Sequence, residues 1–146
     1  MHKLITFIQL PAADRKILLR ACCLLWAVRI GLWVLPFQSV RSFLSRMNRE
    51  PVTAVKGNEW DKVREIVRSV KLMSRYVPAA TCLVQALVVI SLLEQAGLPG
   101  LLRIGVVRTG KKLEAHAWVE SLGRVVIGGT DVDLSRFTVL QTVEGT

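Results

Sequence analysis

Apolar residues form long runs in the first two thirds of the chain and short alternating stretches in the last third. The long runs have helical length or spacing, and they span residues 17–37, 58–76 and 81–95. The short stretches are typical of strands separated by tight turns, and they span residues 101–108, 113–121 and 124–127. Helices followed by a small antiparallel sheet predict an α+β fold.

The first run, ILLRACCLLWAVRIGLWVLPF, is apolar on nearly every side of the helix that it predicts. Its length suits a membrane span, but Arg20 and Arg29 lie inside it. A central arginine costs about 2.5–3.5 kcal/mol on insertion scales. We therefore favour a helix that packs on a core or on a partner protein, and we keep membrane association as the second interpretation.

The segment PVTAVKG at residues 51–57 interrupts the helical pattern. It divides the chain into a hydrophobic helical region, 1–50, and a second region, 51–146, that contains the predicted sheet. We expect the first region to be a docking surface for a partner and the second to be the functional core.

The second run begins with Asn58, a residue that favours the cap position of a helix, and Asp61 follows in the capping-box position. Trp60, Val63 and Val67 then recur at helical spacing. This stripe predicts a helix face that packs into the core rather than a surface that binds a ligand.

Composition adds a charge bias and a redox state to this picture. The formal net charge of +9 favours anionic partners, such as an acidic peptide, nucleic acid or a membrane surface. The cysteines, Cys22, Cys23 and Cys82, are odd in number and two are adjacent, and residues 1–10 lack a signal-peptide pattern. They predict reduced thiols in a cytoplasmic protein.

Cys82 differs from the other two cysteines in its position. It follows Thr81, a good helix cap, and it precedes an apolar run that ends at Gly97 and Pro99. The free N–H groups and the macrodipole at a helix start favour a thiolate and can stabilise an oxyanion. For a lone cysteine the default interpretation is an inert core residue, but this placement indicates a nucleophile.

His116 is the only histidine outside the extreme N-terminus, so any chemistry that needs a histidine base must use it. Strand alternation places Ala115, Ala117 and Val119 on one face of the predicted strand, and His116 with Trp118 on the other. A half-buried surface histidine is the alternative interpretation.

A cysteine–histidine pair usually needs a third group that holds the imidazole. The nearest carboxylates after the third strand are Asp131 and Asp133, while Glu114 and Glu120 lie on the strand of His116 and are expected to face solvent at its ends. The residues alone do not fix which aspartate reaches the histidine.

The stretches CLVQAL, LLEQAGLP, LRIGV, AHAWVE, GRVV and RFTVL, in this order over residues 80–140, resemble the B proteins of lasso-peptide biosynthesis. These are leader peptidases of the transglutaminase-like cysteine protease superfamily. The resemblance implies a papain-like fold without a metal or nucleotide, with Cys82 as nucleophile and His116 as base. The expected acid falls at residues 127–129, which are Ile-Gly-Gly here, so Asp131 is the nearest substitute.

The resemblance also implies the substrate and the partners. The substrate would be the leader–core junction of a ribosomally made precursor, presented by a separate small leader-recognition protein, with the lasso cyclase as a further candidate partner. We expect no nucleic acid partner. Two alternatives stay open: a catalytically silent scaffold that binds those proteins, and a transglutaminase-like acyltransferase that passes the thioester to an amine.

Overall fold

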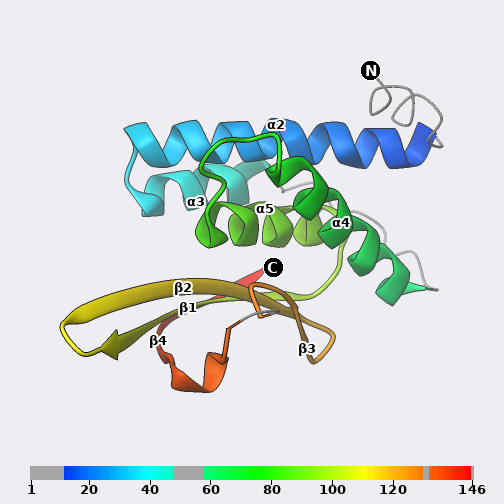
Figure 1. Ribbon diagram of the computed structural model, residues 1–146. Helices are drawn as coiled ribbons and strands as arrows, with labels where there is room; N and C mark the ends of the chain where they lie inside the picture. The colour runs from blue at the N-terminus through cyan, green and yellow to red at the C-terminus, as the bar shows by residue number, and fades with distance from the viewer. Residues whose placement is uncertain (1–11, 48–57, 130–131, 146) are drawn as a thin grey trace.

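The helices cover one face of a four-stranded antiparallel sheet, as Figure 1 shows. The computed structural model describes residues 12–47, 58–129 and 132–145. Its helices are α2 (Ala12–Val34), α3 (Phe37–Met47), α4 (Glu59–Ser74) and α5 (Cys82–Gln95). Its strands are β1 (Gly100–Thr109), β2 (Lys112–Ser121), β3 (Arg124–Ile127) and β4 (Thr138–Gly145), and a short 3₁₀ helix, η1 (Leu134–Arg136), precedes β4. The predicted α+β fold class is confirmed.

The sheet has the strand order β3-β2-β1-β4, so β3 and β4 are its edges. β1 and β2 form a hairpin that closes at the pair Thr109 and Lys112. The chain then turns through Gly123, whose φ is +75°, into β3. The last strand returns to β1, where Gly145 pairs with Gly100. The sequence did not predict β4, and this pairing joins segments that are far apart in the chain.

Helix α5 is the centre of the fold, because it lies between α2 and the sheet (Figure 1). Its residues are buried on both sides, and Leu87 and Leu93 are almost completely inaccessible to solvent. The helix ends where Gly97 adopts a left-handed φ of +67° and the Leu98 N–H donates to the Leu93 carbonyl over 2.9 Å. This C-terminal motif is the one that glycine favours, and it confirms the predicted end of the helix.

Helix α2 packs on α4 and α5 with one face and leaves the other exposed. Its buried residues, Leu18, Ala21, Leu25 and Val28, belong to the same core as α4 and α5. The division at residue 50 stays a prediction, since residues 48–57 lie outside the described part of the chain. Among the described helices, α2 alone is long and apolar enough to cross a membrane, and 28% of that window is buried. Core helices pass the same test of length and composition.

The expected capping box at the start of α4 is wrong. Asn58 occupies the cap position, but its φ of +65° is left-handed and its side chain makes no capping hydrogen bond. A cap residue normally has an extended backbone, from which its side-chain oxygen reaches the second or third helical N–H. Asn58 instead serves as a residue that tolerates positive φ.

Candidate active site

Cys82 is the first residue of α5 and is half-buried. Thr81 precedes it in an extended conformation, and its side chain makes no capping hydrogen bond with the helix. The carbonyl of Thr81 accepts the first intrahelical bond, from Gln85 N–H. The thiol therefore lies beside helix N–H groups that no side chain of the cap residue occupies. Cys22 and Cys23 lie within α2 and lack this environment.

The thiol end of α5 lies over the middle of the sheet. Cys82 and Leu93 are eleven residues apart (93 − 82), close to three helical turns, so they share a face of the helix. Leu93 faces β1 near Gly100. The helix rises 1.5 Å per residue and the strand about 3.3 Å per residue, so eleven helical residues cover the length of about five strand residues. Counted from Gly100, which lies opposite Leu93, Cys82 is therefore at roughly the level of Gly105. Gly105 pairs with His116.

His116 lies near the centre of β2 and is half-buried. Its neighbours Ala117 and Val119 pack into the core beneath the helices. The imidazole instead stacks on Trp118, with ring centroids 6.3 Å apart, and packs against Phe137 at 5.6 Å. The predicted alternation along this strand is confirmed, and His116 leaves the sheet on the face away from α5.

The Nε2 atom of His116 lies 2.5 Å from the backbone carbonyl of Gly128. A carbonyl oxygen only accepts, so Nε2 is the donor in this hydrogen bond. In a neutral imidazole the other nitrogen, Nδ1, is then an acceptor. The bond thus fixes both the tautomer and the orientation of a ring whose Nδ1 can take a proton.

Gly128 takes this position because a side chain there has no room. Its φ is +86°, and an added Cβ would lie 2.6 Å from the Ala117 carbonyl oxygen and 2.8 Å from the Trp118 Cβ. Residues other than glycine rarely adopt this φ, and the contacts are with backbone atoms and with the Cβ of the buried Trp118. A carboxylate from position 128 is therefore excluded, and a main-chain carbonyl occupies the place of the expected acid.

The candidate carboxylates do not provide a third group within the described residues. Asp131 lies outside them. The Asp133 side chain is exposed and accepts from the Ser135 N–H and hydroxyl at the start of η1, which lowers the pKa of this carboxyl. Glu114 is exposed.

Glu120 does not simply face solvent, contrary to expectation. Its carboxylate lies 2.9 Å from Arg103 Nε, an ion-pair contact without an aligned hydrogen bond, and accepts from Trp118 Nε1 over 3.2 Å. This carboxylate is therefore engaged by groups other than the imidazole.

Cys82 and His116 are not hydrogen-bonded to each other in the described structure. The two groups lie at a similar level of the sheet, but the cysteine is on the helix side and the imidazole leaves the other face. β3 ends at Ile127, opposite Val119, so Lys112 to Trp118 have no strand partner on that side among the described residues.

The hydrogen bond to the Gly128 carbonyl was not predicted from the sequence, where residues 127–129 were noted only as lacking the expected acid. The described residues also hold no cluster of three or more histidine, cysteine, aspartate or glutamate side chains that could bind a metal ion.

Comparison with known proteins identifies the family. Residues 22–142 match the model of the transglutaminase-like superfamily, which covers most of the chain and all of the elements that carry Cys82 and His116. No curated protein and no solved structure matches the chain. The chain belongs to the transglutaminase-like superfamily, which includes cysteine peptidases and acyltransferases.

Proposed function

We propose that this protein is a cysteine peptidase that removes the leader peptide from a ribosomally made lasso precursor. The observation that supports it best is the hydrogen bond from His116 Nε2 to the Gly128 carbonyl, because it leaves Nδ1 to act as a base. Cys82, at the N-terminus of a buried helix, is the nucleophile that this base serves. The two side chains lie on opposite faces of the sheet, so the proposal requires the imidazole to reach the thiol around the edge of β2 when substrate binds; catalytic contacts that are absent in a free enzyme can form in its substrate complex.

In the proposed reaction, His116 Nδ1 takes the proton of the Cys82 thiol, and the sulfur attacks the carbonyl carbon at the leader–core junction. The helix N–H groups donate to the oxyanion that forms. The C–N bond then breaks, and the imidazolium gives its proton to the departing amine of the core peptide. Water hydrolyses the thioester, releases the leader and restores the thiol.

The proposal includes a partner that presents the precursor, namely a small leader-recognition protein, with the lasso cyclase as a second candidate. The exposed face of α2 supports such docking, since Leu19, Trp26, Ile30 and Trp33 are large apolar side chains that remain accessible. Trp33 is 82% exposed, and such a large accessible apolar side chain is typical of a surface that a partner protein covers. The proposal sets this assembly in the cytoplasm, a compartment that keeps thiols such as Cys82 reduced.

A catalytically silent scaffold is the second candidate function, and one observation favours it. Within the described residues no hydrogen bond joins Cys82 to His116, and the imidazole leaves the sheet on the far face. A scaffold would bind the recognition protein or the cyclase without chemistry. In a scaffold, Cys82 would react with a thiol-directed peptide electrophile no faster than an ordinary thiol does. In a peptidase, Cys82 would react with this electrophile faster than the exposed Cys23 does.

Mass spectrometry of a lasso precursor incubated with this protein and a leader-recognition protein tests the function. We expect two products, the leader with a free carboxylate and the core with a free amine. With a primary amine added, an acyltransferase would attach that amine to the leader in place of water. An intact precursor under these conditions, with both proteins folded, would sink the peptidase proposal.

Replacement of Asp131 by asparagine distinguishes two ways of holding the imidazole. If the Gly128 carbonyl orients His116, the variant should keep the cleavage rate within about tenfold. If the carboxylate is required, the loss should approach the roughly 10⁴-fold effect of removing a triad carboxylate. The measurement is kcat for leader cleavage, with Asp133→Asn as the control for a neighbouring loss of charge.

A further inference from the structure

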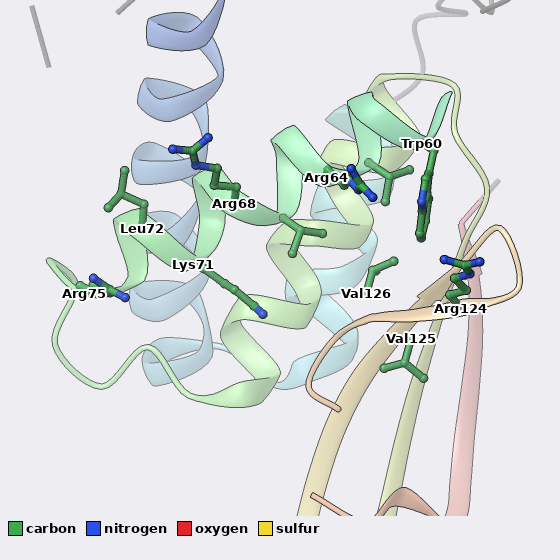
Figure 2. Close-up of a pocket in the computed structure, with 11 residues that line it drawn as sticks. Trp60, Arg64, Arg68, Lys71, Leu72, Arg75, Arg124, Val125 and Val126 are labelled. Atoms are coloured by element: carbon green, nitrogen blue, oxygen red, sulfur yellow. The ribbon is translucent and has the colours of Figure 1, made fainter. Parts of the chain in front are cut away.

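A basic groove runs between α4 and the edge strand β3, away from Cys82 and His116. It has a volume of about 680 Å³. Its lining residues come from one face of α4 and from β3: Trp60, Val63, Arg64, Val67, Arg68, Lys71, Leu72, Arg75, Arg124, Val125 and Val126. Figure 2 shows the side chains of both walls. We use the term basic groove for this set.

The groove carries an unbalanced positive charge. Arg64, Arg68 and Lys71 recur at helical spacing along α4, Arg75 follows as its C-cap residue, and Arg124 faces them from β3. No aspartate or glutamate lines the groove, and within the described residues none of these five cations forms an ion pair. Five cations in one concavity raise the local concentration of anions and favour a ligand with carboxylates or phosphates.

The groove also has an apolar floor, which a simple solvated charged surface would lack. Val63 and Val67 belong to the core, while Val125 is exposed on β3. At the mouth, the Arg124 guanidinium lies 5.4 Å from the centre of the Trp60 ring (Figure 2), which holds both side chains in place. A ligand that fits must therefore combine negative charge with apolar side chains.

The groove and the candidate active site are separate, but β3 links them along the chain. β3 is an edge of the sheet, so one side of its backbone has no strand partner there. Val125, in the groove, is next to Gly129, where an added Cβ would lie 2.7 Å from its side chain. Gly128, the preceding residue, accepts from His116. An extended peptide that lies along β3 would be led toward the imidazole.

We propose that the basic groove binds an extended peptide segment in which carboxylate and apolar side chains alternate. A strand added to β3 sends alternate side chains to opposite sides, so carboxylates can meet the arginines of α4 while apolar groups meet Val125. That this segment belongs to the leader of the precursor rests on the proposed function. A concave groove fits an extended chain better than a flat membrane surface, and one tryptophan already paired with Arg124 offers little stacking for bases.

Fluorescence anisotropy with a labelled peptide of alternating glutamate and valine tests the site. The double variant Arg64→Glu/Arg68→Glu should weaken binding at least about tenfold, because two attractive charges become repulsive. The matched control, Lys111→Glu/Lys112→Glu, makes the same change in net charge on exposed lysines at the β1–β2 turn and should bind like the wild type. Equal weakening in both variants would mean non-specific attraction to a basic protein, and would overturn the proposal.

A charge swap and competition complete the experiment. The Arg64→Glu/Arg68→Glu variant should gain affinity for a peptide of alternating lysine and valine, while circular dichroism shows it folded. Displacement of the acidic peptide by single-stranded RNA or by anionic lipid vesicles at lower concentration than by unlabelled peptide would overturn the peptide assignment.

The binding result is independent of cleavage. Peptide binding without leader cleavage in any assay would refute the proposed function and leave the groove assigned. Cleavage with unchanged KM in Arg64→Glu/Arg68→Glu would refute the groove as the leader site and leave the peptidase.

Discussion

Replacing Cys82 with alanine is expected to lower the rate of leader cleavage by at least about a thousandfold. Removing the nucleophile of a catalytic unit in a related type of hydrolase costs about 10⁶ in kcat, because no other group in the site can form the covalent intermediate. The side chain of Cys82 is half-buried and small, so the fold should survive the change. The measurement is the single-turnover rate of precursor cleavage, followed by mass spectrometry.

Cys22→Ala is the matched control, since Cys22 is a half-buried cysteine in the middle of α2 that packs against the core and lies off the exposed face of that helix. It should cleave at the wild-type rate and should still form the acyl-enzyme on Cys82. If Cys82→Ala also keeps that rate, a nucleophile other than Cys82 acts and the proposed chemistry is wrong. A loss of rate in both variants, with both folded, would show that the loss does not report on the nucleophile and would remove this support for Cys82.

Local signals explain how much of the fold the sequence predicts. Thr81 and Gly97 mark the ends of α5, and the turns at Gly110 and Gly123 have the positive φ that glycine accommodates. Each of these features depends on a few neighbouring residues, so the helix and the hairpin are readable without knowledge of their contacts.

Non-local pairing explains what the sequence does not show. β4 is exposed at most positions, so its pattern does not indicate burial, and its strand partner is the distant β1. The basic groove is a similar case. The positive stripe of α4 is visible as a helical pattern, but Arg124 joins it only because β3 lies opposite in space.

The candidate site also has one part that the sequence indicates and one part that only the structure shows. Cys82 and His116 stand out in the sequence because a helix start and a single strand histidine have distinctive chemistry. The group that holds His116 does not, since a backbone carbonyl is present in every residue and carries no signature. The only hint was a glycine pair where an acid was expected, and its meaning depends on the close approach of Ala117.

Gly128→Ala is expected to destabilise the protein by about 3 kcal/mol and to reduce leader cleavage further than the loss of folded protein explains. A left-handed φ costs a non-glycine residue about 1–2 kcal/mol, and overpacking against buried groups costs typically 1–3 kcal/mol. The added methyl would press on the Ala117 carbonyl and the Trp118 Cβ and shift the carbonyl that accepts from His116. Urea unfolding gives the stability, and kcat and KM at a temperature where the variant is folded give the catalytic effect.

Gly123→Ala separates the backbone effect from the steric one. Gly123 has a φ of +75°, but no atom lies within 4 Å of an added Cβ. This control should lose only about 1 kcal/mol and should keep its kcat, because its turn does not contact the imidazole. Equal destabilisation in the two variants would show that the space around Gly128 is not restrictive. A normal kcat in folded Gly128→Ala would show that another group, with Asp131 the first candidate, orients His116.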